Sequence, residues 1–234
     1  KNSVPESWKS TGILLVNHQE ETMAQKKVNA VIHSQEKLAE GIYSMWLDAP
    51  EMAKAAVPGQ FIAVYTNDQS KLLPRPISIC EADKENGRLR IVYRIAGAGT
   101  KEFSAYKEGD TLDIMGPLGN GFPLKQKKAF LIGGGIGIPP MLELAKNLDC
   151  EKTAVIGYRD KETFLADELR KYADVVIATE DGSVGTKGNV IDAIRAEKLT
   201  ADIIYACGPT PMLKALKTYA MENGIECYME LRFM

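Results

Sequence analysis

A cluster of glycines near the middle of the chain separates an apolar run from a helical pattern. Residues 128–140 read KAFLIGGGIGIPP, with Gly133, Gly134, Gly135 and Gly137 in the turn, and MLELAKNL follows at helical spacing. Glycines let a backbone approach a phosphate group closely, and the next helix N-terminus offers unpaired N–H groups. Ile138 stands where the dinucleotide fingerprint has its third glycine. Taken alone, the stretch therefore fits a phosphate-binding turn and an ordinary tight turn equally well.

A second turn of the same kind lies further along the chain. Residues 202–212 read DIIYACGPTPM, so an apolar run ends in Cys207, Gly208 and Pro209 and a helical pattern begins by Met212. Two strand–turn–helix units in one chain favour a nucleotide site more than either unit does alone.

A cation and a hydroxyl stand close together in residues 73–79, LPRPISI. Arg75 lies between two prolines, which hold the start of a strand rigid. A guanidinium suits a diphosphate because it offers several donors in a fork and cannot be deprotonated. By itself, however, this pattern fits better an exposed arginine on an edge strand, where prolines are tolerated.

Two segments with different sequence patterns must position these residues. From Val28 to about Phe122, short β-rich runs alternate with turns: VNAVIHSQ, IYSMWLDA, QFIAVYT, RPISICEA, LRIVYRIA and DTLDIMG. Six strands at this spacing predict a small closed antiparallel barrel.

From Lys128 onward, strands and helices alternate. The strands are FLIGG, TAVIGY, DVVIATE, DIIYACG and IECYM, and the helices between them are PPMLELAKNL, KETFLADELRKYA, NVIDAIRAEKL and PMLKALKTYAMENG. This order predicts a doubly wound five-stranded parallel sheet covered on both faces. We expect one domain over residues 23–124 and a second over 125–234. Residues 1–22 are aperiodic and are expected to be an extension outside the fold.

The predicted sheet gives the two turns a common location. In a doubly wound sheet the strand order reverses beside the first strand, so strands one and four flank the crevice where ligands bind. The glycine turn follows strand one, and Cys207 to Pro209 follow strand four. Both turns should therefore open into one crevice, which predicts a dinucleotide site.

Composition excludes several other classes of protein. The net charge is -2 and no basic block stands out, so nothing indicates nucleic acid binding. No run has the length of a membrane-spanning helix, and no signal-peptide pattern is present. Four scattered cysteines without C-x-x-C spacing, and two distant histidines, predict neither disulfides nor a metal site and favour the cytoplasm. The cysteines are Cys80, Cys150, Cys207 and Cys227.

Seven motifs occur in the order seen in ferredoxin reductase-like flavoproteins. They are RPIS (75–78), VYR (92–94), GAGT (97–100), GPLG (116–119), GGGIG (133–137), TEDGS (179–183) and CGPTPM (207–212). As a set spanning residues 27–227, they resemble most closely the electron-transfer subunits of bacterial dihydroorotate dehydrogenases. The resemblance implies a flavin-binding barrel followed by a domain that binds a nicotinamide nucleotide.

The resemblance also implies site residues. The FAD site would contain Arg75 at the diphosphate and Ser78 near the ring, together with Pro76, Ile77, Val92, Tyr93, Arg94, Gly99 and Thr100. NAD(H) would be held by Gly133, Gly134, Gly135, Gly137, Asp181, Gly208, Pro209 and Met212, and Cys207 would stand beside the nicotinamide. Hydride passes between nicotinamide C4 and flavin N5, so the protein must mainly hold two rings about 3–3.5 Å apart.

Several of these residues have a purely structural alternative. Cys207 fits a small buried hydrophobe at a strand end equally well. Tyr93 fills a barrel wall in its commoner use, and Asp181 is slightly favoured as a turn residue. After strand two, Asp160 could bind a ribose 2′-hydroxyl and Arg159 a 2′-phosphate, and only the resemblance favours NAD.

One departure from the family concerns its 2Fe-2S cluster. The family continues after the last strand with a cysteine-rich segment, whereas this sequence ends at Met234, shortly after Cys227. Four properly spaced thiolates are absent. We therefore expect a chain that exchanges hydride between NAD(H) and FAD but does not relay single electrons by the family's route.

The sequence as a whole predicts an FAD-dependent electron-transfer subunit of an NAD-linked dihydroorotate dehydrogenase, acting in pyrimidine synthesis with an FMN-containing catalytic subunit in a heterotetramer. One alternative is a subunit of a ferredoxin-NAD(P)H oxidoreductase or of a sulfide or sulfite reductase. Another is a nucleotide-binding module without redox activity.

Overall fold

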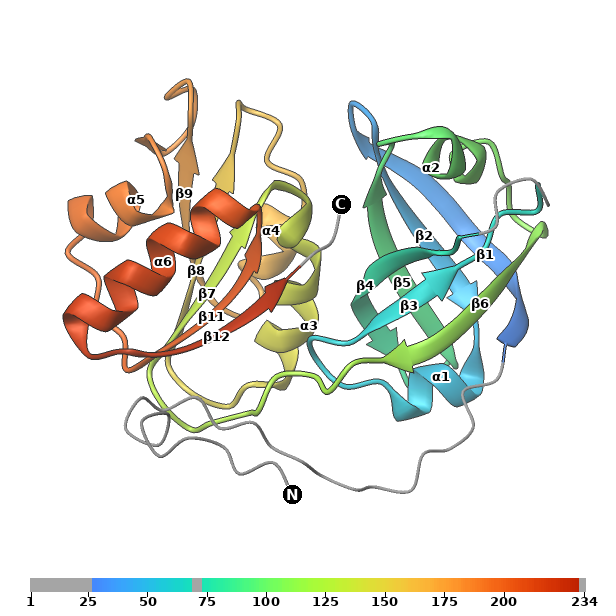
Figure 1. Cartoon of the computed structure of the whole chain (residues 1–234), viewed down its shortest axis with the longest axis horizontal. Coiled ribbons are helices and arrows are strands. Elements are labelled where there is room, and N and C mark those ends of the chain that lie inside the picture. Colours follow the sequence, from blue (N-terminus) through green and yellow to red (C-terminus); the bar gives the residue numbers. More distant parts are fainter. Residues whose placement is uncertain (1–26, 69–72, 232–234) are drawn as a thin grey trace, which may run out of the picture.

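A closed barrel stands beside a parallel sheet in the computed structural model, which describes residues 27–68 and 73–231 (Figure 1). The predicted extension, residues 1–22, lies outside the described residues. None of the helices in the described ranges has the length and apolar character that a bilayer crossing requires.

The barrel confirms the six antiparallel strands predicted from the alternating runs. In barrel order these are β1 (Lys27–Ala39), β2 (Ile42–Asp48), β5 (Arg88–Arg94), β4 (Arg75–Asp83), β3 (Phe61–Val64) and β6 (Thr111–Leu118). Successive strand residues point to opposite faces, so every second side chain enters a buried core that includes Ile32, Met45 and Ile91. Two short helices, α1 (Pro50–Ala55) and α2 (Ala98–Phe103), occur in connections that the sequence predicted as turns.

The second half is the predicted parallel sheet with one additional strand. Its order is β10 (Thr186–Lys187), β9 (Asp174–Thr179), β8 (Lys152–Tyr158), β7 (Ala129–Gly134), β11 (Ile203–Gly208) and β12 (Glu226–Leu231). The five predicted strands are present. The two-residue β10 pairs with β9 through Thr186 and Ala178, and a pair of residues is too short to carry a periodic signal.

Helices cover both faces of the sheet. α3 (Pro139–Asn147) and α4 (Ala166–Leu169) lie between the sheet and the barrel, and α5 (Val190–Ala196) and α6 (Thr210–Asn223) lie on the far face (Figure 1). The predicted helix KETFLADELRKYA is mostly irregular, since only α4 within it is helical.

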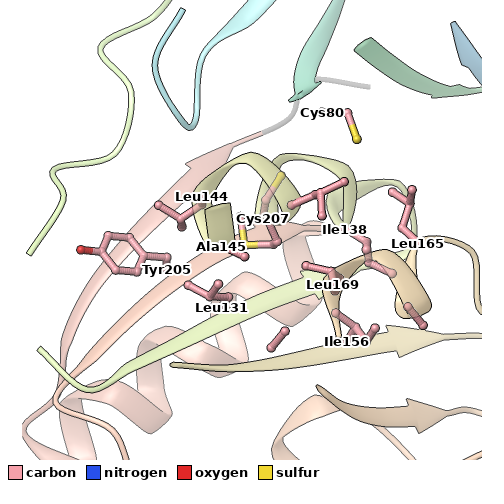
Figure 2. Close-up of a cluster of buried hydrophobic side chains, with 14 of the residues drawn as sticks. Cys80, Leu131, Ile138, Leu144, Ala145, Ile156, Leu165, Leu169, Tyr205 and Cys207 are labelled. Atoms are coloured by element: carbon pink, nitrogen blue, oxygen red, sulfur yellow. The ribbon is translucent and has the colours of Figure 1, made fainter. Parts of the chain in front are cut away.

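A shared apolar cluster joins the two halves of the molecule. Ile42, Cys80 and Val92 of the barrel belong to the same buried cluster as Ile138 and Met141 at the start of α3. Figure 2 shows Cys80 above the rest of this cluster, with Ile138 and Cys207 beneath it. Burial of apolar surface therefore holds the barrel against the sheet.

Candidate functional site between barrel and sheet

The two predicted turns meet, as the sheet topology requires. β7 and β11 are neighbours, and Gly133 is opposite Cys207 in their register. A Cβ on Gly137 would lie 2.1 Å from the carbonyl oxygen of Cys207, and a Cβ on Gly134 would lie 2.7 Å from the sulfur of Met212. Glycine is therefore required at position 137, where the backbones of the two turns are in direct contact, whereas a Cβ at position 134 would press on the side chains of Met212 and Pro209.

A cleft of about 670 Å³ opens where these turns face the barrel. Its sheet wall includes the ends of β7, β8, β9 and β11, and its barrel wall is formed by the β1–β2 hairpin and the end of β5. Of the predicted nucleotide residues, the cleft is lined by Gly134, Gly135, Gly137, Gly208, Pro209 and Met212. The crevice predicted from the strand order is thus present.

Two arginines line the cleft. Arg94 comes from the end of β5, and its Nη2 would lie 3.3 Å from a Cβ on Gly135. Arg159 follows β8 and also lines the cleft. Burial, and then the neighbouring charge of Arg159, lower the pKa of Arg94 below its ordinary value. Two guanidinium groups near a glycine turn provide the donor set that suits a diphosphate.

Carboxylates line the same cleft near the ends of β8 and β9. They are Glu40 on the β1–β2 hairpin, Asp160 and Glu162 after β8, and Glu180 after β9. Glu162 also ties the two walls together, because its carboxylate accepts the backbone N–H of Glu40 at 3.1 Å. Carboxylates accept hydrogen bonds from ribose hydroxyls and repel a phosphate.

Arg75 lies outside this cleft and contacts a different glycine. Its guanidinium would be 2.7–2.9 Å from a Cβ on Gly99, at the start of α2, and it also donates to the carbonyl of Leu73. Thr100 orders the same turn, since its hydroxyl oxygen accepts the backbone N–H groups of Ala96 and Gly97 at 2.8 and 3.2 Å. Arginine, glycine and threonine thus form a compact cradle in which a bare backbone lies beside a fixed cation.

Ser78 connects the flavin strand predicted from the sequence to the sheet. It is 3% exposed, and its hydroxyl donates to Glu230 Oε1 on β12 at 2.6 Å. The second carboxylate oxygen, Oε2, is shielded from solvent and has no hydrogen-bond partner among the described residues. The hydrogen bond joins β4 of the barrel to β12 of the sheet, and the shielded Oε2 atom still lacks a donor among the described residues.

The other predicted flavin residues alternate in direction along their strands. Ile77 and Tyr93 point into the barrel core, where Tyr93 is 2% exposed and its hydroxyl donates to Gln35 at 2.8 Å. Val92 lies in the cluster between barrel and sheet, and Pro76 is exposed. The structure therefore does not bring the Tyr93 ring to the cleft.

Three predicted nucleotide residues also lie apart from the cleft lining. Gly133 is buried under the turn, against Ile138. Cys207 is fully buried in the apolar cluster (Figure 2). The Asp181 carboxylate accepts the backbone N–H and the hydroxyl of Ser183 at 2.9 and 2.7 Å, and these bonds lower its pKa. Asp181 thus orders its own turn.

The cysteines do not gather into a metal site. The four cysteines, all within the described ranges, form no disulfide bond. Within the described ranges, no group of three or more potential ligands could hold a metal ion. The thiolate set of an iron–sulfur cluster is therefore not provided by the residues that the structure describes.

Three parts of the cleft escaped sequence reasoning. Asn189 and the Ala39–Ile42 hairpin line it but belong to none of the seven motifs, and Glu180 lines it from within the TEDGS motif without having been assigned a role. The only available hint for the hairpin was Gly41, a turn glycine with a φ of 68°, which marks a tight connection but not its location.

Comparison with known proteins agrees with this arrangement. The oxidoreductase FAD-binding domain family matches residues 29–122. An NADH-dependent reduced ferredoxin-NADP oxidoreductase has a TM-score of 0.79 and 31% identity, covering 91% of this chain and 79% of that one. A ferredoxin NADP+ reductase from Neisseria gonorrhoeae, with a TM-score of 0.72 over 88% and 98% of the two chains, is 18% identical and supports the fold alone. Barrel, sheet and cleft together define a ferredoxin reductase-like flavoprotein oxidoreductase.

Curated relatives narrow this class to one family. The dihydroorotate dehydrogenase B (NAD(+)) electron transfer subunit of Geobacillus sp. is 40% identical over 219 residues, which are 90% of this chain and 84% of the relative. The subunit of the same name from Streptococcus mutans is 46% identical over 197 residues, 80% of this chain and 76% of the relative. The chain belongs to the family of dihydroorotate dehydrogenase B electron transfer subunits.

Proposed function

We propose that this chain passes reducing equivalents between NAD and a partner subunit through FAD, as the electron transfer subunit of a dihydroorotate dehydrogenase. The observation that carries the proposal is the shared cleft, in which two touching glycine turns of the sheet face Arg94 of the barrel.

The proposal assigns FAD to residues 23–124 and NAD to residues 125–234. The cradle of Arg75, Gly99 and Thr100 would hold the FAD diphosphate, because the fixed guanidinium complements its charge and no Cβ blocks close approach. When bound, FAD supplies the capacity to accept a hydride and to release electrons. The chain's own contribution is to orient the two nucleotides and to exclude water between them.

NAD(H) would occupy the cleft. The turns after β7 and β11 would approach its diphosphate closely, and Arg94 and Arg159 would neutralise it. The carboxylates of Asp160 and Glu180 support a free ribose hydroxyl, which favours NADH over NADPH. Cys207 would support the nicotinamide end from beneath the turn, where its backbone touches Gly137.

Ser78 and Glu230 would lie beside the flavin ring and offer it hydrogen-bonding groups. The unpartnered Glu230 Oε2 and the 2.6 Å hydrogen bond between the two side chains support this role. No histidine or second carboxylate is required, because hydride transfer between stacked rings depends on orientation.

The proposed partner is an FMN-containing catalytic subunit, assembled with this chain into a heterotetramer. A cytoplasmic location is proposed because the four cysteines, all within the described ranges, form no disulfide bond, as is usual in a reducing compartment. A second candidate, a ferredoxin-NAD(P)H oxidoreductase subunit, is supported by the 31% identical NADH-dependent relative.

An absorption spectrum of the purified protein before and after anaerobic addition of NADH, and separately of NADPH, tests the proposal. We expect a yellow protein with an absorption band at about 450 nm. NADH should bleach this band faster than NADPH does. Colourless protein that does not take up added FAD would contradict the flavin assignment. Re-oxidation of the reduced flavin by orotate in the presence of the dihydroorotate-oxidising subunit, but not by oxidised ferredoxin, would favour the first candidate over the second.

A further inference from the structure

The segments that form the two sites are connected through one helix and one strand. α3 begins directly after the glycine turn of β7, and β4 begins at Arg75 and continues through Ser78. α3 packs along β4. The relative position of the glycine turn and the flavin strand therefore depends on how this helix is fixed to this strand.

One edge of β4 is open where α3 crosses it. β3 pairs with β4 only from Arg75 to Ser78. On the other side, the register with β5 shifts between Ile79 and Glu81 before Ala82 pairs with Leu89. A buried backbone N–H on such an edge needs an acceptor from elsewhere.

Glu143 of α3 provides that acceptor. Its Oε2 accepts the backbone N–H of Ala82 at 3.0 Å, and Asn147 Nδ2 donates to its Oε1 at 3.0 Å. The residue is 3% exposed. Next to it, Lys146 of the same helix pairs with Glu81 of β4 at 2.6 Å. Both carboxylate oxygens of Glu143 are thus used, and one of them binds the barrel backbone.

The hydrogen bond between Glu143 and the Ala82 amide has a preferred direction, whereas the apolar contacts around it do not. Apolar packing among Cys80, Met141 and Leu142 tolerates small sliding movements, because hydrophobic burial has no preferred direction. A hydrogen bond to a backbone amide fixes the helix along the strand to a few tenths of an ångström. A buried carboxylate is also a costly choice for a contact that only fills space.

We propose that Glu143 is a positioning residue that sets the separation between the nucleotide turn and the flavin strand by anchoring α3 to the open edge of β4. This inference rests on the proposed hydride exchange between NADH and FAD. Glu143 acts through the backbone of Ala82 and not on the reacting atoms.

Two variants with different hydrogen-bonding capacity test the proposal. Glu143→Gln keeps an oxygen acceptor, whereas Glu143→Leu removes it at similar size. Glu222→Leu, the same change on the exposed surface of α6, is the matched control. The measurements on the full-length FAD-loaded protein are hydrogen exchange of the Ala82 amide, FAD content, and the limiting rate and half-saturation of flavin reduction by NADH.

Glu143→Leu should accelerate exchange of the Ala82 amide by about tenfold. It should also lower the limiting rate of flavin reduction by about tenfold or more, because misplacement by a fraction of an ångström slows a positioned reaction. FAD content and half-saturation should stay near the parent values. Glu143→Gln keeps one oxygen for the Ala82 N–H but turns its NH2 group toward Asn147, so it should lie much closer to the parent than Glu143→Leu does. Glu222→Leu should match the parent.

Parent-like rates in Glu143→Leu, or equal losses in the Gln and Leu variants, would overturn the proposal. If Glu143→Leu does not fold, Glu143→Asp withdraws the carboxylate by one methylene and should slow reduction in the same way; a parent-like rate there is equally contradictory. If NADH does not reduce the parent protein, the proposed function fails, while Ala82 exchange still tests the anchor independently.

Discussion

Replacing Gly137 with alanine tests the contact between the two nucleotide turns. The new Cβ would lie 2.1 Å from the carbonyl oxygen of Cys207 and 2.4 Å from its carbonyl carbon. Both are backbone atoms at the end of a fully buried central strand, so no flexible side chain can move aside. The turns after β7 and β11 must therefore separate.

The size of the effect follows from the distances. Ordinary contact begins at 3.4 Å, so the two turns must separate by about 1.3 Å. Overpacking of this kind costs about 1–3 kcal/mol of stability. A shift of about 1 Å in a site that works by orientation slows the reaction by roughly a hundredfold. We expect the rate of flavin reduction to fall much more than the loss of folded protein alone would cause.

Stopped-flow measurement of flavin reduction by NADH, combined with thermal unfolding, separates these two effects. Gly224→Ala is the matched control, since Gly224 caps α6 with a φ of 66° and lies far from the cleft. Alanine there should lose about 1–2 kcal/mol from backbone strain and keep the parent rate. If Gly137→Ala reduces as fast as the parent protein, the two turns do not form the nucleotide site.

Three further variants examine other parts of the account. Arg75→Ala should lower the flavin-to-protein ratio after gel filtration because the diphosphate loses its cation, and full FAD content would count against the cradle. Tyr93→Phe should lower the free energy of unfolding in urea by about 1–3 kcal/mol, because Gln35 loses a hydrogen-bond donor, and FAD content should not change. Loss of FAD without destabilisation would instead place the Tyr93 ring at the cofactor. Hydrogen bonds, first from Lys125, lower the pKa of Glu226 from 4.5 to about 2. The carboxylate therefore stabilises the fold above pH 4.5 and loses this contribution as the pH falls toward 2. The difference in unfolding free energy between the parent and Glu226→Gln, about 1 kcal/mol or less, should shrink over that range. A difference that does not change with pH would refute the ion pair.

Periodicity and turn chemistry predicted most of the architecture. Alternating runs located the six barrel strands, and apolar runs ending in glycine located β7 and β11. The meeting of the two turns could also be predicted, because the strand order of a doubly wound sheet leaves little choice. The β10 strand and the shortness of α4 depend on tertiary contacts that local pattern does not report.

Side-chain direction was the part that sequence could not supply. Along β5, Val92 faces the sheet, Tyr93 the barrel core and Arg94 the cleft. The sequence shows that neighbouring side chains of a strand point to opposite faces, but it does not show which face meets which ligand. The motif assigned Arg94 and Arg75 to one flavin site, whereas the structure places Arg94 near the glycine turn of β7 and Arg75 at Gly99.

The central claim is that the barrel and the sheet present two cofactors to each other in one cleft. Crystallographic density for the protein soaked with FAD and NAD⁺ tests it most directly. The account predicts the FAD diphosphate beside Arg75 and Gly99, and the NAD diphosphate between Gly135 and Arg94, with the two rings in contact near Ser78. Density that places the NAD⁺ outside this cleft, or the two rings out of contact, would contradict it.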